Sequence, residues 1–180
     1  MPIGWKPPIR GSTSVSRNRP TALPFSKTRR VCRIAYNDKT STGVYYNPKT
    51  RIGYVKGSVT GRDWYDDFTK IPFGKTQKAE RYEQADKAYD DLINHGKSVD
   101  RVVGHSLGGS VALEMQQHHN IPKSRTFGAP VLDLNPFGCP ERYRHPLDPV
   151  SVLDRSATWG PWSGTNPLST HSYTGFGNLQ

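Results

Sequence analysis

The sequence predicts an α/β fold in which helices flank a compact and mostly parallel sheet. Short apolar segments alternate with helical patterns between residues 76 and 127, and this order is typical of parallel strands joined by right-handed crossovers. A chain of 180 residues is also long enough for one domain with a hydrophobic core. We therefore expect one domain at residues 31–180, preceded by an arm at residues 1–30.

The arm differs from the rest of the chain in charge and composition. The sequence has 25 Lys and Arg residues against 15 Asp and Glu, a formal charge of +10. Residues 1–30 hold seven of the basic residues and no acidic one, which leaves only +3 on residues 31–180. Because the arm is rich in Pro, Ser and Thr, we predict that it is disordered. It could bind an anionic membrane surface, bind nucleic acid phosphates, or be a solvated leader.

Cysteine content and hydropathy indicate the cellular compartment in which the protein is expected. Cys32 and Cys139 are too few for a disulfide framework, so two reduced thiols are favoured over a single bridge. No apolar run is long enough to cross a bilayer, and the N-terminus lacks the pattern of a signal peptide. We therefore expect no transmembrane segment, and an intracellular or virion-associated protein in preference to a secreted one.

The first expected elements of the domain are short strands. Residues 31–36, 44–46 and 51–55 are rich in β-branched and aromatic side chains, which predicts strands. The sequence NPKT at residues 47–50 predicts the turn that joins the second of these strands to the third. We interpret this region as a meander or hairpin that leads into the parallel part of the sheet.

Two helices and two further strands follow. Apolar residues recur at steps of three and four over residues 76–95, which predicts an amphipathic helix that Gly96 ends in a left-handed conformation. Residues 106–119 predict a second helix, and residues 101–104 and 125–127 predict the strands before and after it. The last strand is expected either at residues 150–153 or just before Asp148. The tail from Thr158 onward is expected to be loop.

One serine lies where a strand passes into a helix. Residues 102–109 read VVGHSLGG and place Ser106 between Gly104 and Gly108. Side chains two positions before and after a serine on such a tight turn would crowd each other, and glycine removes the clash. The turn projects the hydroxyl from the sheet and aims N–H groups of the new helix at a developing oxyanion. The pattern predicts a nucleophile; the alternative is an ordinary serine in a glycine-rich turn.

A serine nucleophile needs a base and an acid, which in this class of turn follow it in the order Ser, Asp or Glu, His. The acids in suitable positions are Asp133, Asp148 and Asp154, and the histidines after them are His145 and His171. Asp148 has apolar neighbours and an adjacent proline, so its carboxylate could hold an imidazole in one tautomer and stabilise its charged form. His171 lies in a polar loop, as a mobile base would. We therefore favour a triad of Ser106, Asp148 and His171.

Five motifs together resemble those of the class 3 (fungal-type) lipases, serine esterases with the α/β-hydrolase fold. The segment VVGHSLGGSVAL is similar to their nucleophile elbow, and TFGAP at residues 126–130 to the strand end that follows. Residues 148–150 and 171–173 are similar to the segments that carry their catalytic acid and histidine. Residues 55–58, followed by a D-W segment, are similar to their oxyanion loop, although Lys56 replaces the usual arginine.

The resemblance runs from about Tyr36 to Tyr173 and implies a carboxylic ester hydrolase that acts on lipids, either acylglycerols or phospholipids, without metal or cofactor. It implies that Ser106 forms an acyl-enzyme and that the backbone N–H groups of Leu107 and Ser58 hold the oxyanion. Other serine hydrolases, namely a thioesterase, a peptidase or an acyltransferase, would use the same machinery. A catalytically inactive binding protein on this scaffold is the non-enzymatic alternative.

Two further features of the sequence are a possible lid over the site and a group of histidines outside the triad. Family members often cover the site with a lid, and Trp64, Phe68 and Ile71 share one face of a possible helix after the oxyanion loop. They predict either an amphipathic flap that contacts substrate or a helix packed on the core. The remaining histidines, at positions 95, 118 and 119, are interpreted as surface residues, because no Cys or carboxylate lies at metal-ligand spacing from them.

Overall fold

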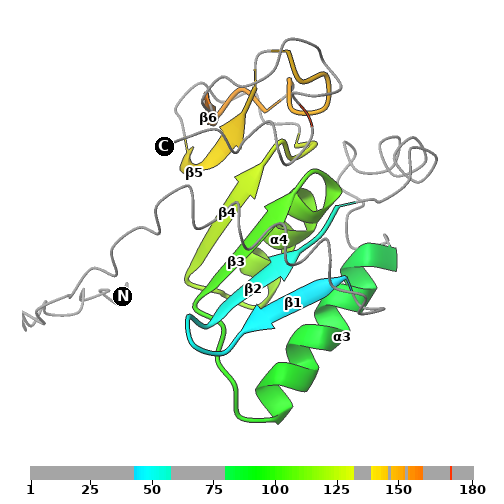
Figure 1. Cartoon of the computed structure of the whole chain (residues 1–180), viewed down its shortest axis with the longest axis vertical. Coiled ribbons are helices and arrows are strands. Elements are labelled where there is room, and N and C mark those ends of the chain that lie inside the picture. The colour runs from blue at the N-terminus through cyan, green and yellow to red at the C-terminus, as the bar shows by residue number, and fades with distance from the viewer. Residues whose placement is uncertain are drawn as a thin grey trace, which may run out of the picture.

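The computed structural model describes residues 43–57, 80–131, 139–145, 147–152, 154–159 and 171. Its strands are β1 (Val44–Asn47), β2 (Ile52–Val55), β3 (Arg101–His105), β4 (Lys123–Phe127), β5 (Cys139–Arg144) and β6 (Ala157–Trp159), and its helices are α3 (Glu80–Asn94) and α4 (Leu107–His118). The six strands lie side by side in the order β1 to β6 (Figure 1). Only β1 and β2 pair antiparallel; all the other neighbouring pairs are parallel. The predicted α/β class with a mostly parallel sheet is confirmed, while the arm at residues 1–30 and the strand at residues 31–36 lie outside the described residues.

The hairpin between β1 and β2 forms where the sequence predicts it. The side-chain Oδ1 of Asn47 accepts hydrogen bonds from the backbone N–H groups of Lys49 at 3.0 Å and Thr50 at 3.4 Å, which closes an Asx turn. Arg51 completes the reversal with a φ of 54°. Its own N–H donates to the Asn47 carbonyl at 2.8 Å, so that β2 starts in register with β1.

Both described helices pack on the same face of the sheet. Strands β2, β3 and β4 follow one another without a reversal of direction, and right-handed crossovers then place successive helices on one side. The buried residues of this layer are Val55, Tyr82, Ala85, Val99, Val102, Val111, Ala112, Met115 and Ile121. Gly96 ends α3 at a φ of 68°, as predicted. Neither of these two helices is long and apolar enough to cross a membrane.

The C-terminal strands differ from the sequence-based expectation. Residues 150–152 form a turn, so the prediction of a last strand at 150–153 is wrong. A strand does lie before Asp148, as the alternative predicts, but this strand, β5, is followed by β6 and is not the last. Strand β6 is not predicted from the sequence, and it includes Thr158 and Trp159, where the sequence predicts loop. The position of β6 depends on contacts between separate segments, which no local sequence pattern predicts. One such contact places the Arg144 guanidinium 3.9 Å from the centre of the Trp159 ring.

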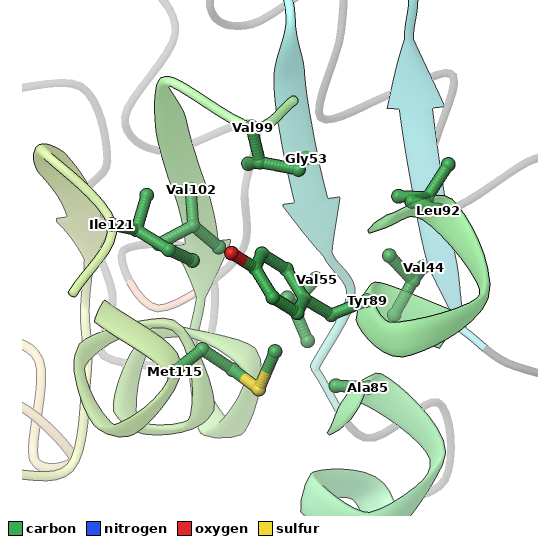
Figure 2. A pocket seen from close by; sticks show the side chains of 10 residues that line it. All are labelled: Val44, Gly53, Val55, Ala85, Tyr89, Leu92, Val99, Val102, Met115 and Ile121. Atoms are coloured by element: carbon green, nitrogen blue, oxygen red, sulfur yellow. The ribbon is translucent and has the colours of Figure 1, made fainter. Parts of the chain in front are cut away.

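A small apolar cavity of about 20 Å³ lies between α3, α4 and the sheet (Figure 2). It is lined by Val44, Gly53, Val55, Ala85, Tyr89, Leu92, Val99, Val102, Met115 and Ile121. The volume would admit about one water molecule, but the only polar side-chain group in the lining is the Tyr89 hydroxyl (Figure 2), which is too few partners for a buried water, so we expect the cavity to be dry. Val99 and Ile121 precede β3 and β4, which places this cavity away from the carboxyl ends of the strands.

Gly53→Ala is expected to stabilise the protein by about 0.5–1 kcal/mol. A Cβ at this position would meet only a Val99 methyl group, at 3.8 Å, and would therefore fill part of the cavity without overlap. Alanine also restricts the unfolded chain more than glycine does. Denaturation in urea measures the effect; an unchanged or lower free energy of unfolding would contradict the assignment of this space as empty.

Candidate active site

Ser106 lies on a strained turn between β3 and α4. Its φ of 54° and ψ of −132° are uncommon for a residue with a side chain and project it from the end of the sheet. A Cβ on Gly104 would overlap the Gly108 carbonyl, and one on Gly108 would overlap the Val55 carbonyl. Glycine is therefore required at both flanking positions: at Gly104 for the predicted reason, a clash within the turn, and at Gly108 for a different one, the close approach of the backbone at the end of β2.

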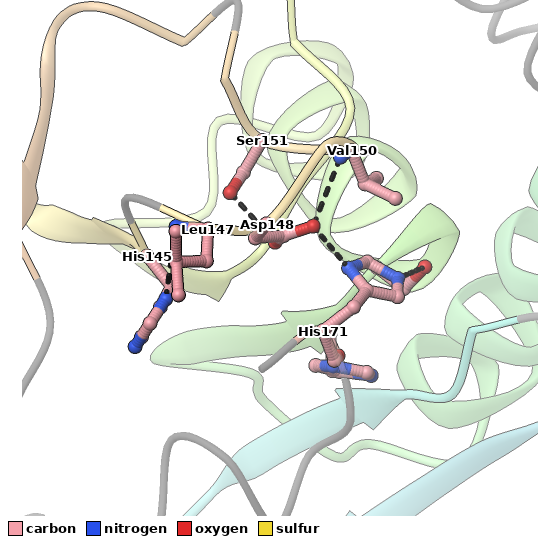
Figure 3. Close-up of polar contacts among 8 residues, drawn as sticks. His145, Leu147, Asp148, Val150, Ser151 and His171 are labelled. Atoms are coloured by element: carbon pink, nitrogen blue, oxygen red, sulfur yellow. Dashed lines mark hydrogen bonds and ion pairs between the residues drawn. The ribbon is translucent and has the colours of Figure 1, made fainter. Parts of the chain in front are cut away.

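The structure brings the three residues of the predicted triad together. Ser106 Oγ lies 2.8 Å from His171 Nε2, and His171 Nδ1 lies 2.9 Å from Asp148 Oδ1. The imidazole therefore bridges a hydroxyl and a carboxylate that are 42 positions apart in the chain. Figure 3 shows the ring of His171 facing the Asp148 carboxylate.

Asp148 is held as a buried carboxylate. Its side chain is inaccessible to solvent, and its second oxygen accepts a hydrogen bond from Ser151 Oγ at 2.7 Å, while Oδ1 also accepts from the Val150 N–H at 2.9 Å (Figure 3). Burial raises the pKa of Asp148, but the hydrogen bonds from His171, Ser151 and Val150 outweigh it and hold the pKa below its ordinary value. The group is therefore ionised at neutral pH.

An ionised Asp148 fixes the tautomer of His171. A carboxylate can only accept, so Nδ1 carries the ring proton and Nε2 presents a lone pair to the Ser106 hydroxyl. The His171 side chain is 17% exposed, which leaves the base within reach of water. Chemically, this arrangement can remove the serine proton as the hydroxyl attacks a carbonyl, and can return it to a leaving group.

The other described candidates for the acid and the base of the triad make contacts outside it. Asp154 is buried and forms a bidentate pair with the Arg142 guanidinium, which ties the segment before β6 to β5. His145 is also buried, and its Nδ1 accepts the Leu147 N–H at 3.2 Å in the turn before Asp148. Asp133 lies outside the described residues. Among the described candidates, only Asp148 faces His171.

One of the two predicted oxyanion donors can be placed. Leu107 is the first residue of α4, and an N–H at this position has no acceptor within the helix. Ser58 lies outside the described residues, as do Trp64, Phe68 and Ile71 of the predicted lid. The backbone of Val55 and Lys56, which leads toward Ser58, packs directly against Gly108.

His105 is a site residue that the sequence reasoning missed. Its Nε2 lies 2.7 Å from the backbone carbonyl of His171. Burial lowers the pKa of His105 to about 3, and the nearby imidazole of His171 adds to this effect. The ring is therefore neutral, and because a carbonyl only accepts, Nε2–H donates. His105 thus positions the backbone of the base, although its place inside the G-x-S-x-G pattern was the only hint.

His105→Phe is expected to lower kcat roughly tenfold with little change in KM, since about 1.4 kcal/mol of positioning is lost with the hydrogen bond. His105→Gln can place an amide N–H where Nε2–H was and should recover most of the activity. Esterase kinetics on a soluble substrate measure both variants. If the glutamine variant were as slow as the phenylalanine variant, a positioning role for the N–H would be wrong.

The same residue predicts a pH dependence of stability. The unfolded chain protonates His105 near its ordinary pKa of 6.5, whereas the folded chain does so only at about 3. As the pH falls below 6.5, the unfolded state binds the additional proton, and the free energy of unfolding decreases. Both His105 variants should show a shallower decrease between about pH 6.5 and pH 4.5; an unchanged slope would contradict the buried neutral ring.

Comparison of the chain with protein-family models, with curated proteins and with solved structures found no match. The resemblance to class 3 lipases therefore stays a prediction from five motifs. Any functional assignment rests on the geometry of Ser106, His171 and Asp148 and on the chemistry that this geometry allows.

Proposed function

We propose that the chain is a serine carboxylic ester hydrolase of the α/β-hydrolase type, similar to class 3 lipases, which cleaves acylglycerols or phospholipids. The observation that carries this proposal is the continuous hydrogen-bond relay from Ser106 through His171 to Asp148. The strained elbow under Ser106 and the parallel sheet behind it support the proposal, because both are what an exposed serine nucleophile needs.

The first half of the reaction forms an acyl-enzyme. Ser106 Oγ attacks the ester carbonyl while His171 Nε2 takes the hydroxyl proton, and the Asp148 carboxylate stabilises the resulting imidazolium. The Leu107 N–H, with Ser58 as the second predicted donor, holds the negative oxygen of the tetrahedral intermediate. The intermediate collapses when His171 gives the proton to the leaving alcohol, and the acyl group remains on Ser106.

The second half releases the acid. His171 removes a proton from water, the hydroxide oxygen attacks the acyl carbonyl, and the new intermediate expels Ser106 Oγ, which recovers its proton from the imidazolium. The products are a carboxylic acid and free enzyme, so the cycle needs no cofactor. Acyl transfer would follow the same steps with an alcohol in the place of water.

A substrate panel tests the proposed class. We expect the full-length chain to hydrolyse emulsified acylglycerols or phospholipid vesicles more efficiently than thioesters and peptides, and Ser106→Ala to remove all of these activities. A preference for thioesters or peptides would assign the same machinery to another class of hydrolase. No turnover of any of these substrates, with intact fold, would favour the inactive binding protein.

The basic arm at residues 1–30 fits a lipid substrate, since each Lys or Arg near an anionic membrane contributes about 1 kcal/mol of attraction. Binding of the full-length chain to phosphatidylserine vesicles should therefore exceed binding of a chain that lacks the arm, and should fall with added salt. Preferential binding to RNA or DNA in the same assay would assign the arm to nucleic acid instead.

A further inference from the structure

Three potential metal ligands converge at the end of α4 farthest from Ser106. His118 is the last residue of α4, His119 caps it, and Asp86 reaches them from α3. One ligand atom from each of the three lies within 4.8 Å of the other two. His119 Nε2 lies 2.6 Å from Asp86 Oδ1. Sequence spacing could not reveal this group, because the carboxylate comes from a different helix.

Aromatic contacts hold both imidazoles in place. The Tyr89 ring stacks on His119, with centroids 4.0 Å apart, and Tyr82 meets His118 edge-on at 6.4 Å. The two imidazoles are nearly perpendicular, with centroids 4.7 Å apart. Ordered rings on two packed helices reduce the entropy lost when the ligands bind an ion.

The local charge favours a cation, although the chain as a whole is strongly basic. Helix α3 carries five acidic residues against two basic ones, and α4 contains no Lys or Arg. The C-terminal end of a helix also carries partial negative charge from its free carbonyl groups, and His118 and His119 lie at that end of α4. Nothing in the sequence of either helix beyond Arg81 and Lys87 would repel a divalent ion.

We propose that Asp86, His118 and His119 bind one divalent transition metal ion, of which zinc fits best, and that the ion clamps the end of α4 to α3. Imidazole nitrogen and carboxylate oxygen are preferred zinc ligands, and water would complete a tetrahedral set. Zinc ligands lie roughly 3.3 Å from one another, so the ligand atoms of Asp86 and His119, now 2.6 Å apart, would separate slightly, and the exposed His118 would adjust to the ion. The site is separated from Ser106 by the length of α4, about 18 Å for 12 residues, so the ion would take no part in chemistry at Ser106.

Zinc binding by the metal-free, full-length chain tests this proposal. Isothermal titration calorimetry is expected to give one equivalent for the wild type, and zinc is expected to raise the Tm because it binds the folded state. His118→Ala, which removes an exposed side chain, should bind zinc at least about tenfold more weakly. Asp86→Asn, which is nearly isosteric, should do the same, and a given zinc concentration should raise the Tm of either variant less than that of the wild type.

His95→Ala is the matched control. His95 lies just after α3, and its Nδ1 donates to the Asp91 carbonyl at 2.6 Å, outside the cluster. This variant should keep the affinity of the wild type. The proposal is overturned if the wild type binds no stoichiometric zinc, or if His118→Ala and Asp86→Asn bind as the wild type does. Neither readout involves ester hydrolysis, so the result is independent of the proposed function.

Discussion

Ser106→Ala is expected to lower kcat on any ester that the chain hydrolyses on the order of 10⁶-fold. Without Oγ there is no acyl-enzyme, and His171 can act only on water. The decrease in kcat is large because the serine and its base act together, so that removal of either one prevents formation of the acyl-enzyme. Binding of the substrate should change little, and the fold should be kept, because Ser106 Oγ contacts only His171 among the side-chain hydrogen bonds of the described residues.

Ser110→Ala is the matched control for this change. Ser110 lies one turn further along α4, is equally buried, and donates to the Pro130 carbonyl at 3.3 Å. Its loss should cost stability on the order of 1 kcal/mol but leave kcat within a factor of about two. Equal activity of the Ser106 variant and the wild type would show that a different residue performs the attack.

Asp148→Asn is expected to lower kcat about 10⁴-fold. The amide keeps the shape of the carboxylate but has only one oxygen, so it can accept from Ser151 or from the Val150 N–H, and not from both. It has no negative charge to stabilise the imidazolium, and where its NH₂ group replaces Oδ1 it favours the His171 tautomer with the lone pair on Nδ1. Nε2 would then carry a proton and could not accept that of Ser106. Kinetics on a soluble ester and the rate of labelling by a fluorophosphonate probe should fall together.

Asp154→Asn separates this electrostatic effect from a general loss of stability. Asp154 is as buried as Asp148 but pairs with Arg142 and not with the imidazole. The variant should unfold more easily, because the mostly buried Arg142 guanidinium would pair with a neutral amide in place of the Asp154 carboxylate. Its kcat below the unfolding transition should be near that of the wild type. If Asp154→Asn were as inactive as Asp148→Asn, a general destabilisation of the active site would explain the loss of activity in both variants.

Most of the sheet could be predicted because local patterns determine its elements. The Asx turn at Asn47, the glycine stop at Gly96 and the apolar periodicity of α3 and α4 are each specified within a few residues of sequence. Strand β6 could not be predicted in this way. It has only three residues, and its place depends on contacts such as that between Arg144 and Trp159, which join separate segments.

The candidate site could be predicted in part. The elbow around Ser106 is recognised from a local pattern, and Gly104 avoids a clash within that turn, whereas Gly108 makes room for the backbone of Val55 and Lys56, which are distant in the chain. The choice between Asp148 and Asp154 depends on where β5 and the segment after it direct each carboxylate. The positioning role of His105 depends on the carbonyl of His171, which is 66 positions away. The carboxylate of Asp86 near His119 is likewise 33 positions from its partner.

The most direct measurement is labelling of the full-length chain with a fluorophosphonate probe, followed by peptide mass spectrometry to locate the adduct. An activated serine should react, and the account predicts a single adduct on Ser106 that is lost when His171 is changed to Ala. Failure of the folded wild type to react, or an adduct on another residue with Ser106 unmodified, would contradict the claim that His171 and Asp148 activate Ser106.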